Sequence, residues 1–189
     1  MEKILRLLVT EILTDDWPVK KRGDFGAKDI PVIESFDYDK VVICGGEPLL
    51  FKRNIERLAQ TIAVIGDATG KRAKVYIETS CCNYLKIDAI RKYINGVVLM
   101  PKTKADMQYF KQLNNEILKN RYFYEKKELR LLVIPSVSYF LPENLRMWQV
   151  TELQDDNIPV SSEGCDYRRL NRLWEDDEGW YDFERTLYG

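Results

Sequence analysis

The segment Cys44-Gly45-Gly46-Glu47-Pro48-Leu49-Leu50 is the part of the sequence best suited to hold a ligand. It follows an apolar run typical of a buried strand and precedes a stretch with helical spacing. Glycines let a ligand approach the backbone closely, and Glu47 would stand at the carboxyl end of the strand, where α/β proteins bind their ligands. The alternative is a plain tight turn, because a Gly-Gly pair also serves that purpose alone.

Other chemically reactive residues are few. The sequence contains no histidine, which removes the commonest general base and metal ligand, so neither Ser-His-Asp hydrolysis nor ordinary zinc catalysis is expected. The cysteines Cys44, Cys81, Cys82 and Cys165 are too unevenly spaced for a disulfide scaffold, and adjacent cysteines seldom bind one metal. We therefore predict buried structural thiols and no metal site.

The hydropathy pattern predicts the scaffold that positions these residues. Short runs rich in Val, Ile and Leu alternate with amphipathic stretches, which is typical of a parallel sheet built from βαβ units. The segment 14–39 has little periodicity and is expected to be mostly loop. We predict strands at residues 4–10, 41–44, 74–79, 96–100, 129–134 and 146–153, and helices over the apolar positions 55–65, at 86–93 and at 104–120.

Length and charge narrow the class of protein. A chain of 189 residues can form one domain with a full core, which we assign to residues 1–154. Residues 155–189 form an acidic, aromatic extension that we expect to pack on this domain or on a partner. With 29 Lys and Arg, 30 Asp and Glu and no basic run, there is no strong nucleic-acid signal. No apolar run suits a membrane span or signal peptide, so a cytoplasmic protein is expected.

The glycine turn resembles a motif of the radical S-adenosylmethionine (radical SAM) family. In that family a Gly-Gly-Glu-Pro turn after the second strand binds the amino group of the methionine moiety of S-adenosylmethionine. The resemblance therefore implies that Gly45, Gly46 and Glu47 bind this cofactor.

Two later stretches are similar to the subfamily that contains 7-carboxy-7-deazaguanine synthase. Tyr76-Ile77-Glu78-Thr79-Ser80 resembles its Glu-Thr-Asn-Gly stretch, and Leu99-Met100-Pro101-Lys102 resembles its Ser-Pro-Lys stretch. By this likeness Glu78, Thr79 and Lys102 line the same mouth of the fold. The activating enzyme of anaerobic ribonucleotide reductase is a comparable short relative.

The sequence departs from the family at its iron–sulfur site. The family places C-x-x-x-C-x-x-C after its first strand, and here those three positions carry Leu13, Trp17 and Lys20. None of these side chains supplies the thiolate that binds iron in such clusters. Because the cluster donates the electron that cleaves S-adenosylmethionine, we predict that both cluster and radical chemistry are absent.

The resemblance implies a particular architecture within the α/β class. That architecture is a partial (βα)6 TIM-like barrel of parallel strands, open on one side and approached by ligands from the carboxyl ends of the strands. Either the extension or a partner, including a second copy of the chain, would close it. A doubly wound open sheet is the alternative, because both folds share the βα repeat.

Three functions follow from these observations, and no catalytic residue is assigned. The preferred one is a degenerate, cluster-less homologue that acts as a binding, regulatory or partner subunit and retains a pocket for S-adenosylmethionine or another nucleotide-like ligand. The second is a non-radical enzyme that uses Glu47, Glu78, Lys102 and Cys44 in the same pocket. The third is an active radical enzyme whose cluster is held by other cysteines or by a partner chain.

Overall fold

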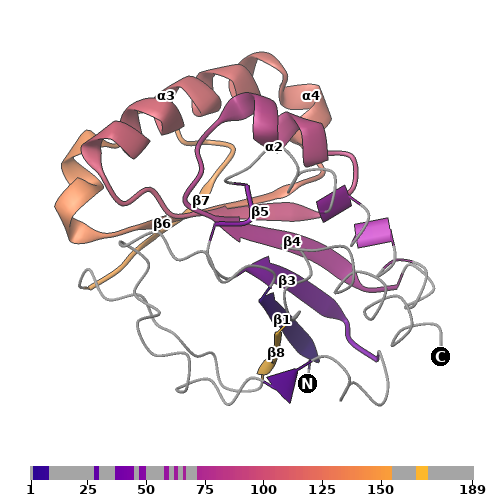
Figure 1. Cartoon of the computed structure of the whole chain (residues 1–189). Helices are drawn as coiled ribbons and strands as arrows, with labels where there is room; N and C mark the ends of the chain where they lie inside the picture. Colours follow the sequence, from indigo (N-terminus) through magenta and orange to yellow (C-terminus); the bar gives the residue numbers. More distant parts are fainter. Residues whose placement is uncertain are drawn as a thin grey trace.

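Parallel strands form a single sheet with helices packed against it (Figure 1). The computed structural model describes residues 2–8, 28–29, 37–44, 47–49, 58–59, 62–63, 66, 72–154 and 165–169. The segment 13–20, which carries the three positions compared with the cluster-binding cysteines, lies outside these ranges, as do Gly45 and Gly46.

Six strands occupy the positions that the sequence predicts, which confirms an α/β fold with a parallel sheet. They lie side by side in chain order, and each pairs in parallel with the next. Their bounds are β1 Ile4–Leu8, β3 Lys40–Cys44, β4 Lys74–Thr79, β5 Gly96–Leu99, β6 Glu128–Val133 and β7 Gln149–Glu152.

Two further strands extend the sheet beyond β1. Strand β8, Cys165–Arg169, pairs in parallel with β1, and the two-residue strand β2, Lys28–Asp29, pairs with β8. The hydropathy pattern predicts neither, because β2 lies in the segment expected to be mostly loop and β8 in the extension. The sheet therefore runs in the order β2-β8-β1-β3-β4-β5-β6-β7.

Helix ends are set by side chains that satisfy the exposed N–H groups of the first turn. Helix α2, Tyr84–Ile90, begins after Asn83, whose side chain accepts a hydrogen bond from the backbone N–H of Lys86. Helix α3, Lys104–Lys119, begins with a capping box between Thr103 and Asp106. Residues 72–154 also contain the short helix α4, Arg121–Tyr124, and the 3-10 helix η2, Pro135–Phe140.

The first predicted helix is described only in part. Leu58, Ala59, Ile62, Ala63 and Gly66 are helical, and Leu58 and Ile62 are buried. Their spacing of four residues places both on one face, as the apolar pattern predicts. No described helix is both long and apolar enough to pass through a membrane.

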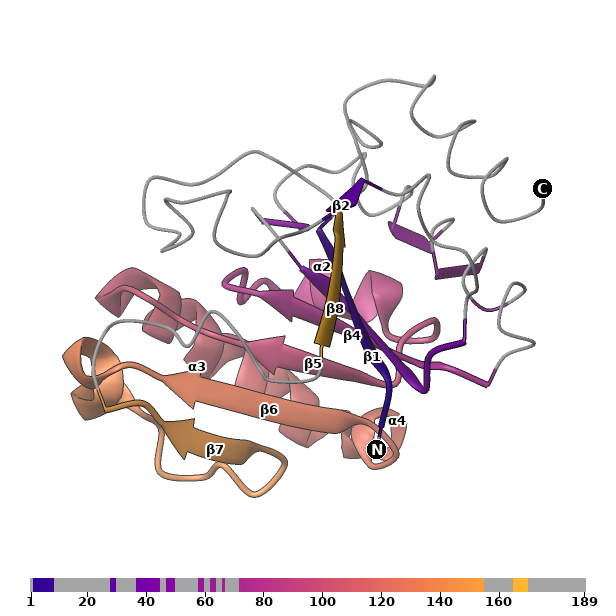
Figure 2. The same cartoon turned by 90° about the horizontal axis from the view of Figure 1, so that it is seen from below.

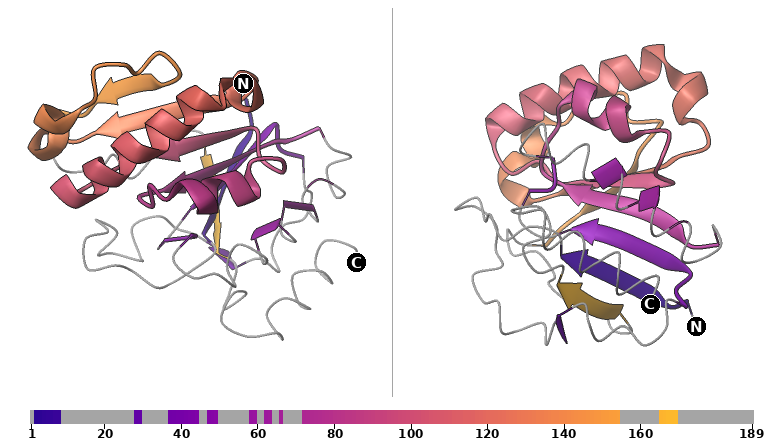
Figure 3. Two further views of the ribbon diagram at one scale, coloured as in Figure 1. Left: turned by 90° about the horizontal axis from the view of Figure 1, so that it is seen from above. Right: turned by 45° about the vertical axis from the view of Figure 1, so that its right-hand side comes forward.

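Helices α2, α3 and α4, which are labelled in Figure 1, all cover the same face of the sheet (Figure 3). Helix α2 connects β4 to β5 and α3 connects β5 to β6, so consecutive crossovers return on one side. From β1 to β7 the strand order has no reversal, whereas a doubly wound sheet has one and carries helices on both faces. The paired strands do not close into a ring, since β2 and β7 remain the two ends of the described sheet.

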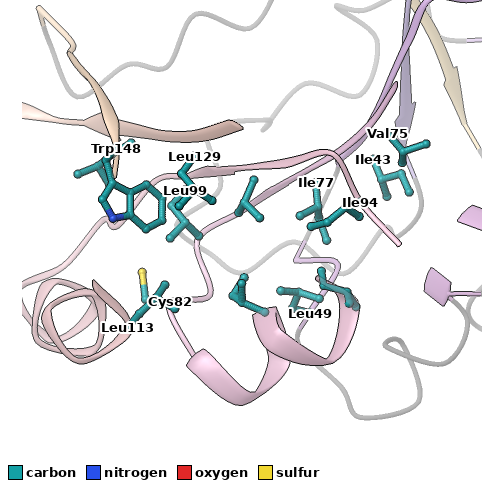
Figure 4. Packing of buried hydrophobic residues seen from close by; sticks show 14 of the residues in the cluster. Ile43, Leu49, Val75, Ile77, Cys82, Ile94, Leu99, Leu113, Leu129 and Trp148 are labelled. Atoms are coloured by element: carbon teal, nitrogen blue, oxygen red, sulfur yellow. The ribbon is translucent and has the colours of Figure 1, made fainter. Parts of the chain in front are cut away.

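The main hydrophobic core lies between the sheet and these helices (Figure 4). Alternate strand residues such as Ile43, Ile77 and Leu99 point toward the helices and meet residues such as Leu113. Trp148 packs edge-on against Phe110 of α3, with ring centroids 5.1 Å apart. On the opposite face of the sheet, which we call the helix-free face, the buried cluster contains only Val42, Cys44 and Tyr76 among the described residues.

A buried amide joins α3 to the segment before β7. The Asn114 side chain accepts a hydrogen bond from Trp148 Nε1 at 3.0 Å and donates one to the Asn144 carbonyl at 2.9 Å. Asn114 is 1% exposed and its contact with Trp148 is buried, so the Trp148 N–H would be left without a partner if the amide were removed.

We therefore expect Asn114→Ala to lower the free energy of unfolding by about 1–3 kcal/mol, the cost of unsatisfied buried polar groups. Urea denaturation followed by tryptophan fluorescence measures this loss. Asn115→Ala is the matched control, because Asn115 is the exposed neighbour on the same helix. Equal destabilisation by the two substitutions would contradict a specific role for the buried amide.

Candidate functional site

The Glu47 carboxylate joins the turn after β3 to the end of β4. Its Oε1 accepts hydrogen bonds from the backbone N–H of Leu49 at 3.1 Å and from the hydroxyl of Thr79. Its Oε2 accepts from the backbone N–H of Ser80 at 2.8 Å and from the Ser80 hydroxyl at 2.7 Å. Strands β3 and β4 are parallel neighbours, so their carboxyl ends meet at one edge and bring these groups together.

These four contacts occupy the acceptor capacity of the carboxylate, which has about four lone-pair positions. Glu47 is 4% exposed, and a buried charge of this kind needs such donors. Thr79 Oγ1 also accepts from the backbone N–H of Cys81 at 3.0 Å, so the same hydroxyl orders the segment after β4. Glu47 thus links the ends of β3 and β4 through hydrogen bonds.

Glu78 lies on the helix-free face, away from the Glu47 carboxylate. Successive residues of a strand point to opposite faces, so Glu78 and Thr79 diverge although they are adjacent in sequence. Glu78 Oε2 accepts a hydrogen bond from Arg6 Nη2 at 2.5 Å, forming an ion pair between β4 and β1. The pair spans β3 at Val42, which is in register with Arg6.

The structure therefore divides the predicted site residues. It brings Glu47 and Thr79 into direct contact, and it places Glu78 with Arg6 on the other face. Lys102 follows β5, and its backbone N–H donates to Asp106 Oδ2 at 3.1 Å. The ends of β5 and β4 lie close together, because the backbone N–H of Met100 donates to the Thr79 carbonyl at 3.1 Å.

A second polar group on the helix-free face crosses the four neighbouring strands β3 to β6. Tyr76 of β4 is in register with Gly96 of β5, which is in register with Glu128 of β6. The Tyr76 hydroxyl donates to Glu128 Oε1 at 2.9 Å, and Arg130 Nη2 donates to Glu128 Oε2 at 3.1 Å. Lys40 Nζ lies 4.2 Å from the centre of the Tyr76 ring.

The electrostatics of this group follow from its partial burial. Burial lowers the pKa of Lys40, and the nearby Arg130 guanidinium lowers that pKa further. Burial and the hydrogen bond to Glu128 raise the pKa of Tyr76 to about 12. Burial opposes ionisation of Glu128, but the hydrogen bond from Tyr76 and the charges of Arg130 and Lys40 outweigh it and hold its pKa below the usual value.

None of the predicted site residues belongs to this group, although the sequence contains a signal for it. Central strands of parallel sheets are normally apolar on both faces. In β6 the charged residues Glu128 and Arg130 alternate with buried Leu129 and Leu131, which indicates one apolar and one polar face. That period of two identifies a polar face, but the partner strands cannot be read from it.

The cysteines do not share one location. Cys44 belongs to the buried cluster of the helix-free face, whereas Cys82 belongs to the core beneath the helices and Cys81 packs at its margin. Burial raises the pKa of both the Cys81 and the Cys82 thiols, which disfavours the reactive thiolate. In the ranges that the structure covers, no three His, Cys, Asp or Glu residues are grouped so that they could hold a metal ion.

Comparison with known proteins yields no match to a family model, to a curated protein or to a solved structure.

We expect Glu47→Gln to destabilise the fold by about 1–3 kcal/mol, because the amide replaces one acceptor oxygen with a donor that faces buried donors. Chemical denaturation measures the change, and Glu143→Gln, at an exposed loop position, is the control for loss of one negative charge. If Glu47→Gln is as stable as this control, the carboxylate does not stabilise the contact between the ends of β3 and β4.

Proposed function

We propose that this chain is a radical SAM-like partial barrel that binds a polar small molecule without radical chemistry, as a binding, regulatory or partner subunit. The observation that carries the proposal is the Arg6–Glu78 ion pair on the helix-free face. Opposite charges there offer matched contacts to a ligand that itself carries both charges.

The arrangement of the sheet supports the barrel part of the proposal. Parallel strands in chain order, with helices on one face, are what a singly wound barrel requires. Seen from below, the strand direction also turns markedly between β6 and β1 (Figure 2). In such a barrel the helix-free face becomes the interior, where Arg6 and Glu78 would meet a ligand.

The proposed ligand is S-adenosylmethionine or a related molecule with an amino-acid group. Its ammonium would pair with Glu78 and its carboxylate with Arg6. Glu78 would thus exchange the Arg6 guanidinium for the ligand ammonium, and Arg6 would exchange the Glu78 carboxylate for the ligand carboxylate. Glu47 would hold the turn that contains Gly45 and Gly46, whose role in ligand binding is carried over from the resemblance. Lys102, beyond β5, would stand at the same carboxyl edge.

The non-radical part of the proposal rests on the sequence. Leu13, Trp17 and Lys20 stand where the family has cluster-binding cysteines, and none of them provides a thiolate. The separation of Cys44 from Cys82 by the sheet gives no support to a replacement cluster built from both. Without an electron donor the ligand would be bound intact.

A partner subunit has an available edge in this proposal. Residues of β7, Gln149–Glu152, are exposed along the whole strand, and among the described strands β7 pairs only with β6. An unpaired strand edge presents backbone donors and acceptors to another chain. A partner or a second copy would close the barrel there.

We expect S-adenosylmethionine to bind the wild-type protein and to bind Glu78→Gln about tenfold more weakly, because a hydrogen bond to a charged group is weakened. Isothermal titration calorimetry measures both affinities, with Glu143→Gln as the control that removes an exposed carboxylate. Negligible heat with the wild-type protein would exclude the ligand, and equal affinity for Glu78→Gln would exclude this carboxylate.

Anaerobic purification should yield protein without stoichiometric iron or sulfide, because the three cluster positions lack thiols. Metal analysis and absorption spectroscopy after reconstitution test this. Recovery of one intact cluster per chain would overturn the non-radical proposal in favour of an active enzyme.

A further inference from the structure

The polar group on the helix-free face also has features of a binding site. We call Lys40, Tyr76, Gly96, Glu128 and Arg130 the Tyr76 cluster. It extends from Lys40, which begins β3, to Arg130 of β6, which is level with Glu78 because both are in register with Val98 of β5. It shares no residue with the Arg6–Glu78 pair but is its neighbour on the same face, because Tyr76 is level with Arg6 across β3 and Arg130 is level with Glu78 across β5.

The cluster depends on a close approach at Gly96. A Cβ atom added there would collide with the Glu128 carbonyl oxygen and come within 2.8 Å of Cδ1 in the Tyr76 ring. Only glycine therefore lets the Tyr76 ring lie across β5 and reach the Glu128 carboxylate on the next strand. The ring provides a rigid floor beside the two cations.

Positive charge at the cluster exceeds the negative charge that pairs with it. Both Glu128 oxygens are already engaged, one by the Tyr76 hydroxyl and one by Arg130 Nη2. Lys40 contacts the Tyr76 ring and makes no ion pair with any residue in the described part of the chain.

Arg130 has an unused donor in the same place. Its Nε is buried and has no hydrogen-bond partner among the described residues, although Nη2 of the same guanidinium contacts Glu128. A buried N–H without a partner is unfavourable and indicates a missing acceptor. A guanidinium offers donors in a planar fork that matches an oxyanion, and an ammonium adds a point charge.

The wider surroundings also favour an anion. Lys40 is influenced by two further cations, Arg130 and Lys74, and by the carboxylates Glu2 and Glu128. Of these carboxylates Glu2 is exposed at the start of β1, and Glu128 is engaged as described. An anion between Lys40 and Arg130 would reduce the repulsion between the two cations.

We propose that the Tyr76 cluster binds the phosphate group of a small molecule, which Lys40 Nζ and Arg130 Nε contact beside the Tyr76 ring. Phosphate fits better than a single carboxylate, because it carries more negative charge and more acceptor oxygens for these separate donors. A side chain at position 96 would remove the site by displacing the ring.

Titration with inorganic phosphate at constant ionic strength, followed by calorimetry, tests the proposal. We expect saturable binding to the wild-type protein and binding about tenfold to a hundredfold weaker to Lys40→Met and Arg130→Met, because a charged hydrogen bond is lost. Lys111→Met, which removes an exposed cation from α3, should bind as the wild type does. Equal affinity in Lys40→Met and the wild type would overturn the proposal, as would acetate that binds as tightly as phosphate.

A measurement on the unmutated protein covers the case in which a variant does not fold. Lysine side chains are labelled by ¹³C-dimethylation, and their NMR signals are followed during the phosphate titration. The Lys40 signal should shift while the Lys111 signal remains in place. An unshifted Lys40 signal at saturating phosphate would exclude the site. Loss of S-adenosylmethionine binding in Glu78→Gln would leave this result unchanged, so the two proposals fail separately.

Discussion

Charges on the helix-free face of the sheet need partners on that same face, and this constraint links the strand order to the chemistry of the site. A charge that is removed from water without a partner is strongly unfavourable. Arg6 and Glu78 satisfy each other across β3, and Tyr76 and Glu128 do so across β5. Each pair skips one strand, so each requires three strands to lie in a particular order.

Register matters as much as order. Because side chains alternate along a strand, a slip of one residue would turn Glu78 or Glu128 into the core beneath the helices. Gly96 shows how tight the arrangement is, since its missing side chain is the space that the Tyr76 ring occupies. The apolar residues on the other face, among them Ile77 and Leu131, enforce the same register through the core.

Strand β4 contributes residues to both proposed sites and to the contact with the Glu47 carboxylate. Its Tyr76 belongs to the Tyr76 cluster, its Glu78 pairs with Arg6, and its Thr79 donates to Glu47. Residues two apart on one strand thus reach different depths of the same face, while the residue next to Glu78 serves the opposite face. A polar ligand at Arg6 and Glu78 and an anion at Lys40 and Arg130 would therefore bind to neighbouring residues of the same face.

Hydrophobic periodicity was sufficient for the elements whose apolar residues are local in sequence. It predicted the six strands from β1 to β7 and the helices near 86–93 and 104–120, because burial of a repeating face leaves a repeating pattern. It did not predict β8, which is five residues long and gains its place by pairing with the distant β1. For the site, the glycine turn points to Glu47 and the family resemblance to Glu78 and Thr79, but neither gives their division between two faces.

The amino-acid pattern alone is enough to predict that strands alternate with helices, that a glycine turn with an acidic residue follows one strand, and that thiolates are missing from the three compared positions. The folded chain adds that Glu47 accepts hydrogen bonds from Thr79 and Ser80, that Glu78 pairs with Arg6, and that Lys40 and Arg130 both lie near the Glu128 carboxylate. The physical reason is that alternation along a strand tells which face a residue points to, whereas its partner depends on the order and register of strands that are distant in sequence.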